Sequence, residues 1–225
     1  MIGLFREELN ASTLRDSLPA QSRFMLEAAG PHRLRDFLAH QPEITEILQL
    51  EQKSSAEITV GDRLYVLAGK LDRLDRREQG LVILDYKTGR TSKSPRREFW
   101  HDENLWQAMR EWRPGMADPL PDLADSLPSL QLPCYLYMCG HDPKNAHFTR
   151  LSPLADAAWV QLADGGEELS LMGAKMEEDE RRTVIEERIA ELLSFVLRHM
   201  TESREFRPRR TQSCERCPYR EHCGR

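Results

Sequence analysis

Three apolar segments separated by short turns constrain the fold of this chain more than any other feature. Rich in Val, Ile, Leu and Tyr, they are Glu57–Val60, Leu64–Leu71 and Leu81–Tyr86. The turns between them contain Gly61-Asp62 and Gln79-Gly80, residue pairs that favour turns. Short apolar runs bounded by turn residues are typical of strands. We therefore predict three consecutive antiparallel strands in this part of the chain.

Helical patterning flanks these strands on both sides. We expect helices within residues 1–45, broken at Pro19 and at Gly30-Pro31, and then at Glu98–Trp112, Leu130–Cys139 and Val184–Met200. Two short strands that extend the sheet are expected at Ala146–Leu151 and Ala158–Leu162. The stretch from Pro114 to Pro128 is rich in Pro and Asp, so we expect it to be irregular. The pattern as a whole indicates an α/β domain.

Size and composition are those of a soluble globular protein. The chain has 225 residues, of which 40% are hydrophobic and 31% are charged. No apolar run approaches the ~20 residues that span a bilayer, and the N-terminus lacks the layout of a signal peptide. We therefore expect a cytoplasmic protein without a membrane partner. Its pattern divides it into an N-terminal helical segment (1–45), a core (46–203) and a tail rich in Arg and Cys (204–225).

The distribution of charge favours a nucleic-acid partner more than the total does. A formal net charge of -5 argues against such a partner. The stretch from Tyr86 to Arg97 nevertheless contains five basic residues and no acidic one. We identify Lys93, Arg96 and Arg97 in this stretch as candidates for contact with DNA phosphates. Ordinary solvated surface is the alternative interpretation of the same residues.

Two acidic residues and a lysine form the candidate catalytic group. Asp72 ends one apolar segment, Asp85 ends the next, and a hairpin around Glu78–Gly80 places the two side by side. Side chains alternate along a strand, so Asp85 and Lys87 project from the same face. Paired carboxylates resist ionisation unless a cation compensates their charge, and oxygen ligands suit Mg2+ or Mn2+. A surface hairpin with an ordinary Asp–Lys ion pair is the alternative.

Three motifs resemble signatures of a known nuclease superfamily. They are Gly69-x-x-Asp72-Arg73-x-Asp75, Asp85-Tyr86-Lys87-Thr88-Gly89 and Gln131-x-x-x-Tyr135. In type and order they are similar to those of the PD-(D/E)XK nucleases, in particular the RecB-like branch. The resemblance covers roughly Glu51 to the C-terminus. It implies a restriction-endonuclease-like core, which is a mixed central sheet with an antiparallel three-strand meander flanked by helices.

The resemblance also implies roles for single residues. Asp72 and Asp85 would ligate the metal, with help from the Tyr86 carbonyl. Lys87 would position or activate the attacking water and stabilise the charge that develops on the phosphate. The metal itself lowers the pKa of bound water from ~16 toward neutrality and polarises the phosphate.

Residues further from the metal complete the expected site. Gln131 would orient Lys87 or contact the DNA backbone. Tyr135 would stack or pack near the strand, although its apolar neighbours make a place in the helix core a serious competitor. Glu51 precedes the first expected strand, where relatives often have a glutamate.

Three cysteines close the chain with a spacing that resembles an iron–sulfur site. Cys214-x-x-Cys217-x-x-x-x-x-Cys223 is similar to the C-terminal part of the staple in AddB-type helicase–nucleases and CRISPR-associated exonuclease relatives. A [4Fe–4S] cluster takes four thiolates, and the upstream cysteine of those families is absent here. Cys134 and Cys139 lie on the Gln-x-x-x-Tyr helix, where we expect them to be small core residues.

We therefore expect a remnant site without an intact cluster. The tail should be irregular and packed against the early helices, with its three cysteines close together. A zinc site that adds His222 and a reduced tail without metal are the alternatives. The histidine that the branch usually carries on an early helix has no clear counterpart, since neither His32 nor His40 has the expected setting. Both absences predict that the N-terminal segment is incomplete.

Two functions of different classes fit these observations. The first is a Mg2+- or Mn2+-dependent deoxyribonuclease, an exonuclease that acts with a helicase in DNA recombination or repair. The second is a nuclease-fold module with weak catalysis that binds DNA or a protein partner. The complete Asp72, Asp85 and Lys87 set favours the enzyme, whereas the missing histidine and cysteine favour the module.

Overall fold

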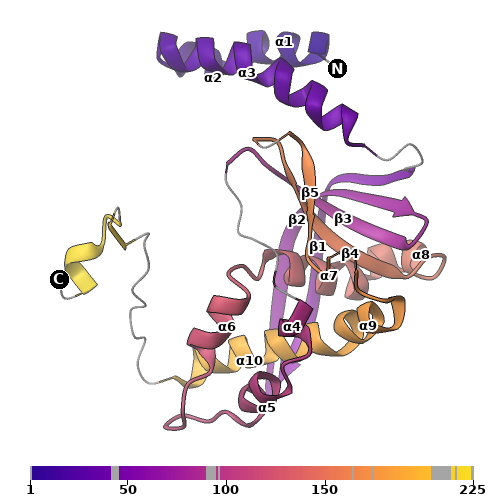
Figure 1. The fold of residues 1–225 in the computed structure, drawn as a ribbon, viewed down its shortest axis with the longest axis vertical. Coiled ribbons are helices and arrows are strands. Elements are labelled where there is room, and N and C mark those ends of the chain that lie inside the picture. The colour runs from indigo at the N-terminus through magenta and orange to yellow at the C-terminus, as the bar shows by residue number, and fades with distance from the viewer. Residues whose placement is uncertain are drawn as a thin grey trace.

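The computed structural model describes residues 2–41, 46–89, 95, 97–163, 165–173, 175–203, 214–215 and 217–223. The N-terminal segment forms three helices, α1 (Ile2–Ala11), α2 (Thr13–Ser17) and α3 (Ala20–Ala39), which lie together at one end of the molecule (Figure 1). The break expected at Gly30-Pro31 is wrong, because α3 continues through Pro31. The ring of Phe5 packs where a side chain on Gly30 would lie, so α1 and α3 approach closely at this point.

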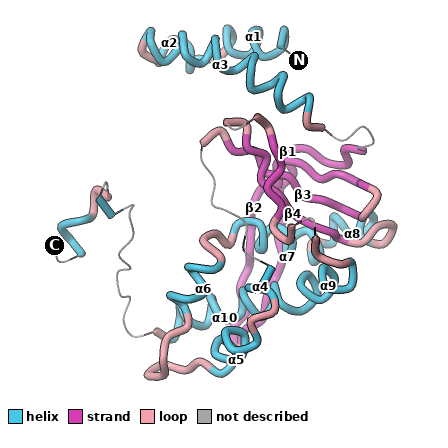
Figure 2. The backbone as a smooth tube through the Cα atoms, in the orientation of Figure 1, coloured by secondary structure: helices cyan, strands magenta, loops and turns pink. Residues whose placement is uncertain are grey.

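A five-stranded mixed sheet forms the centre of the protein (Figure 2). Its strands are β1 (Glu46–Val60), β2 (Arg63–Arg77), β3 (Gly80–Lys87), β4 (Leu154–Gln161) and β5 (Glu167–Ser170), paired in that order. The pairs β1–β2, β2–β3 and β4–β5 are antiparallel, whereas β3–β4 is parallel. The predicted three-strand meander and mixed α/β sheet are thus confirmed. The sequence did not predict β5.

The strand predicted at Ala146–Leu151 is wrong, because α8 (Ala146–Thr149) occupies this position. A 3-10 turn at Pro143–Asn145 leads directly into α8. The Asp142 carboxylate accepts a hydrogen bond from the Lys144 backbone N–H at 3.0 Å and so starts this turn. The chain is therefore already helical when it reaches Ala146.

One face of the sheet is covered by the remaining helices. These are α4 (Arg97–Trp100), α5 (Glu103–Glu111), α6 (Leu120–Ser126), α7 (Gln131–His141), α9 (Glu178–Thr183), a π-helical turn (Val184–Arg188) and α10 (Ile189–Glu202). The single helix predicted at Glu98–Trp112 is divided, because Asp102 caps a new helix by accepting from the Leu105 N–H at 3.1 Å. The stretch expected to be irregular between Pro114 and Pro128 contains α6.

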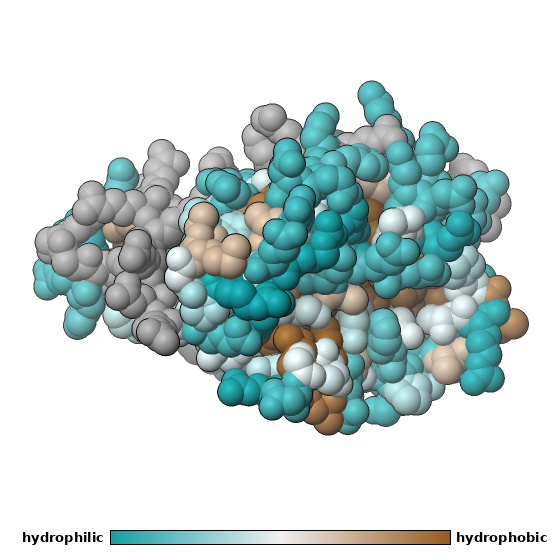
Figure 3. Space-filling model, turned by 90° about the horizontal axis from the view of Figure 1, so that it is seen from below, coloured by the Kyte–Doolittle hydropathy of each residue, from teal (hydrophilic) through white to brown (hydrophobic). Residues whose placement is uncertain are grey.

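Strand β3 is buried on both of its faces, as expected for a strand beside a parallel neighbour. Leu81 and Ile83 join the large core under α5, α7 and α10. Val82 and Leu84 form a smaller cluster on the opposite face with Phe37 of α3. The face in Figure 3 is mainly hydrophilic, with separate apolar patches.

The cysteine tail does not pack against the early helices. Residues 214–215 and 217–223 lie well apart from α1–α3 in Figures 1 and 2, so this expectation is wrong. The tail has little apolar surface to bury, and Tyr219 remains 68% exposed. In the part of the chain that the structure describes, no helix is long and apolar enough to cross a membrane.

The docking of α3 on the sheet depends on Gly166 in the turn between β4 and β5. Gly166 has a φ of +78°, and a Cβ there would lie 2.4 Å from the Phe37 Cα. We predict that Gly166→Ala destabilises the protein by about 1–3 kcal/mol through this overlap. Gly165→Ala is the matched control. Gly165 has a similar φ of +79°, but the atom nearest to a Cβ at this position, the His40 Cε1, is 3.9 Å away. Equal losses in denaturant unfolding for both variants would contradict the account.

Candidate active site

The candidate site lies in a fork where β2 and β3 diverge. The two strands pair from Arg77↔Gly80 to Arg73↔Leu84, and the next residue on each strand is Asp72 or Asp85. Beyond this level β2 continues with β1, whereas β3 continues with β4. The Asp72 Oδ2 accepts a hydrogen bond from the Tyr86 backbone N–H at 2.9 Å. A side chain thus replaces the strand partner that Tyr86 has lost.

Lys87 and Asp85 meet on the helix-covered side of this fork. The Lys87 Nζ lies 2.6 Å from the Asp85 Oδ2, with the Asp85 side chain only 4% exposed and that of Lys87 32% exposed. Their same-face placement follows from the alternation of β3. The Lys87 ammonium therefore contacts the buried Asp85 carboxylate, although the lysine side chain remains partly exposed to solvent.

Helix α7 provides the other wall of the site. The Gln131 Nε2 donates to the Asp85 Oδ1 at 2.8 Å and to the Tyr135 hydroxyl at 2.9 Å. Gln131 and Tyr135 are one helical turn apart, so they lie on the same face of α7. The approach of α7 to β2 uses Gly69, because a Cβ there would be 2.9 Å from the Met138 Cε. Gln131 thus contacts Asp85, whereas the sequence analysis had linked it to Lys87 or DNA.

The electrostatics of the fork favour a cation. Burial raises the pKa of Asp85, the adjacent Lys87 ammonium opposes this shift, and the negative charge of Asp72 adds to it. The Asp85 Oδ2 is paired with the Lys87 ammonium at 2.6 Å, and the Oδ1 accepts from Gln131. Two adjacent carboxylates are oxygen donors of the kind that a hard divalent cation takes. The described residues contain no group of three His, Cys, Asp or Glu that could hold a metal, so the donor set here is two carboxylates and backbone.

Arg73 forms a second polar network that the sequence analysis did not assign. It binds Asp75 through two hydrogen bonds, from Nε to Oδ1 at 2.6 Å and from Nη2 to Oδ2 at 2.8 Å. Its Nη1 donates to Gln41 at 2.6 Å and to the Tyr86 hydroxyl at 3.4 Å. The network joins β2 and β3 to Gln41, two residues after the end of α3. The Asp-Arg-x-Asp spacing was its only signal in the sequence.

Several other sequence candidates lie elsewhere or beyond description. Lys93 and Arg96, and the side chain of Arg97, are outside the described residues. Glu51 does not precede the first strand, because β1 begins at Glu46. Glu51 instead lies inside β1 and forms an ion pair with Lys70.

The cysteines fall into two groups. Cys139 is fully buried, and burial raises its pKa to about 12, which agrees with the expected core role. Cys134 is half-buried against the same core. In the tail the Cys217 N–H donates to the Cys214 carbonyl at 3.3 Å, which places these two residues in one turn. The side chain of Cys223 is outside the described residues.

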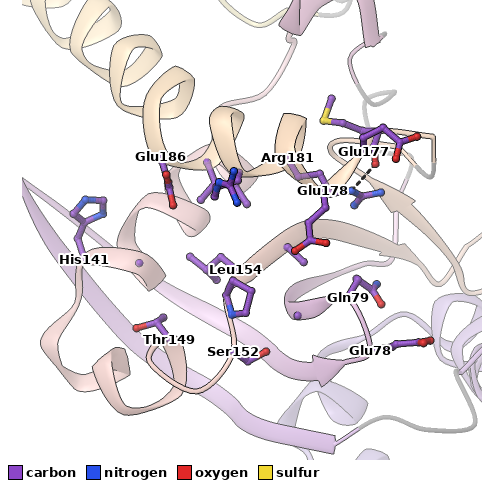
Figure 4. Close-up of a pocket in the computed structure, with 17 residues that line it drawn as sticks. Glu78, Gln79, His141, Thr149, Ser152, Leu154, Glu177, Glu178, Arg181 and Glu186 are labelled. Carbon is purple, nitrogen blue, oxygen red and sulfur yellow. Dashed lines mark hydrogen bonds between the residues drawn. The ribbon is translucent and has the colours of Figure 1, made fainter.

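A cavity of about 1050 Å³ lies at the opposite end of β3, around the β2–β3 hairpin and α9 (Figure 4). Glu78, Glu177, Glu178 and Glu186 line it, and these carboxylates would repel phosphates. Its Arg181 already binds Asp156 at 3.3 Å and the Gly173 carbonyl at 3.0 Å. This cavity does not provide a path for nucleic acid to the fork.

We predict that Asp85→Asn raises the thermal stability of the cation-free protein near neutral pH. The folded-state pKa of Asp85 is raised, so its penalty is absent below the unfolded pKa and appears as the pH rises through the folded pKa. The neutral amide avoids this penalty, and the gain in Tm should therefore grow from about pH 4 to pH 7. Asp62→Asn, in the exposed β1–β2 turn, should show no such trend. A wild-type protein that is the more stable at pH 7 in EDTA would contradict this cause.

Comparison with known proteins identifies the family of this chain. None of the curated proteins matches the chain. A solved structure described as "Crystal structure of SSO0001" aligns with 99% of this chain and 81% of its own at 16% identity, with a TM-score of 0.35. The family model described as "PD-(D/E)XK nuclease superfamily" matches residues 3–224. The chain therefore belongs to the PD-(D/E)XK nuclease superfamily.

Proposed function

We propose that this protein is a metal-dependent deoxyribonuclease that hydrolyses phosphodiester bonds at the fork. The observation that carries the proposal is the convergence of Asp72, Asp85 and Lys87 at the point where β2 and β3 separate. Membership of the superfamily supports hydrolysis of nucleic acid as the reaction. DNA as the substrate rests on the resemblance of the motifs to the RecB-like branch.

The donor set at the fork fits a divalent cation. Asp72 and Asp85 would hold Mg2+ or Mn2+, with the Tyr86 carbonyl as a further oxygen ligand. When bound, the ion supplies Lewis acidity to the phosphate and lowers the pKa of a bound water. The Asp85 carboxylate is buried, and the nearby Asp72 carboxylate adds negative charge that a cation would offset.

The residues around the carboxylates have separate tasks. Lys87 brings a positive charge to the fork, where it orients the attacking water and stabilises the charge that develops on the phosphate. Gln131 fixes the orientation of Asp85 by donating to its Oδ1, and the Tyr135 hydroxyl fixes Gln131 in turn. Such hydrogen bonds restrict the motion of the Asp85 carboxylate. Catalysis requires this restriction, because the reacting groups must be held in a fixed geometry.

The wider setting also belongs to the proposal. The resemblance supports exonuclease action beside a helicase in DNA recombination or repair. Lys93, Arg96 and Arg97 would contact phosphates, because they follow Lys87 closely in the chain. We further propose a division into an N-terminal helical segment (1–45), a nuclease core (46–203) and a tail (204–225) with a remnant [4Fe–4S] site.

A binding module with weak catalysis is the second candidate. It is favoured by the small donor set, since the described residues bring no group of three metal-binding side chains together. The Asp85–Lys87 ion pair also satisfies both charges without a cation. The two candidates differ in whether cleavage accompanies binding.

We predict cleavage of DNA that requires Mg2+ or Mn2+ and is lost in Asp85→Ala and in Lys87→Ala. Each variant should lower the rate at least about 100-fold, because each removes a group that acts on the transition state. Lys53→Ala, an exposed change on β1, should cleave at the wild-type rate. Wild-type rates in both site variants would refute the assignment. DNA binding without cleavage by the wild type would favour the module.

We predict that the basic residues in the stretch from Tyr86 to Arg97 contribute to DNA binding. Replacing Lys93, Arg96 and Arg97 together by Ala should weaken binding and flatten the dependence of log K on log salt concentration. Each lost phosphate contact should reduce this slope by about 0.7–0.9. Fluorescence anisotropy with a labelled oligonucleotide at several salt concentrations measures it. An unchanged slope would indicate that these three residues belong to ordinary solvated surface.

A further inference from the structure

Glu51 has an unusual backbone conformation inside β1. Its φ is +54°, and among the described residues it is the one non-glycine residue with a positive φ. The left-handed region is disfavoured for residues that carry a Cβ and is rare within a strand. Glu51 lies opposite Asp72, between the pairs Leu50↔Arg73 and Gln52↔Leu71. The irregular residue and a candidate metal ligand thus occupy the same level of the sheet.

At this level, the side chains of both strands change the face of the sheet from which they project. In β1, the Gln49 Nε2 donates to the Asn145 Oδ1 at 3.1 Å, and the Asn145 Nδ2 donates to the Ser54 Oγ at 3.5 Å. Regular alternation would place residues five apart on opposite faces. In β2, Leu71 and Leu74 are three apart, yet both are buried in the same core at 1% and 0% exposure. The alternation of side chains is therefore displaced by one position in each strand.

This displacement decides where Asp72 and Arg73 point. With regular alternation, Leu74 would leave the large core and Arg73 would take its place there. Instead Arg73 lies on the other face with Asp75 and Gln41. Asp72 falls at the change of face, and its carboxylate reaches sideways to the Tyr86 N–H in the fork. With regular alternation after Leu71, the Asp72 side chain would project from the face opposite the large core.

The side chain of Glu51 does not explain its position. Its carboxylate pairs with Lys70, but the two side chains are 61% and 53% exposed, and exposed ion pairs contribute little. We propose that Glu51 is a positioning residue that acts through its left-handed backbone, which turns β1 and β2 so that Asp72 enters the fork. The catalytic meaning of this inference rests on the proposed nuclease function.

Substitutions that separate backbone from carboxylate test the proposal. Glu51→Gly adopts the left-handed conformation freely, Glu51→Gln keeps the shape of the side chain, and Glu51→Val disfavours the conformation through its branched Cβ. Lys53→Val is the matched control, because Lys53 is an exposed residue of the same strand with regular pairing to Lys70.

Hydrogen exchange of the Tyr86 amide, measured by NMR in EDTA, gives a readout that needs neither cation nor activity. Glu51→Gly, Glu51→Gln and Lys53→Val should exchange within about twofold of the wild type, whereas Glu51→Val should exchange about tenfold faster. The rise in Tm on adding Mn2+ should be kept in the first three variants and lost in Glu51→Val. If Glu51→Val does not fold, Glu51→Thr replaces it.

Two outcomes would overturn the inference. One is normal Tyr86 protection in Glu51→Val, or in Glu51→Thr where that variant replaces it. The other is faster exchange in Glu51→Gly and Glu51→Gln as well, which would make the carboxylate the active part. A wild-type protein that neither binds Mn2+ nor cleaves DNA would contradict the proposed function, while the exchange rates would still decide the role of Glu51.

Discussion

The hydrogen bond from the Tyr86 N–H to the Asp72 carboxylate marks the place on which the site depends. At this level β3 leaves β2 and continues beside β4, so its backbone loses a partner. The carboxylate supplies that partner at 2.9 Å and is thereby held in the plane of the sheet, beside Asp85. The same divergence opens the space into which α7 brings Gln131 and Tyr135. Fold and site are thus consequences of one departure from regular pairing.

The site also costs the protein stability. Asp85 is buried, and burial raises its pKa against the influence of Lys87. Its two oxygens contact Lys87 and Gln131, and its pKa nevertheless remains raised. Charged groups are seldom buried in this way unless a ligand or a reaction uses them. On the opposite face, the Arg73–Asp75 pair and the Phe37 cluster keep the strands rigid behind the fork.

Sequence patterns predicted the parts of this arrangement that depend on local order. The apolar segments and turns predicted the meander, and the hairpin around Glu78–Gly80 predicted that Asp72 and Asp85 lie side by side. The helical spacing of Gln131 and Tyr135 placed both on one face. The remaining features depend on contacts that local patterns do not contain. The polar β5 exists through its pairing with β4 and the Arg77–Glu168 ion pair, and the left-handed Glu51 has no signal in its residue type.

The central claim is that the fork binds a divalent cation between two carboxylates. Anomalous scattering from a crystal soaked in Mn2+ tests it most directly. The account predicts a strong peak within about 2.3 Å of carboxylate oxygens of both Asp72 and Asp85, close to the Tyr86 carbonyl. A crystal with no peak at the fork, or with Mn2+ only in the acidic cavity at the other end of β3, would contradict it.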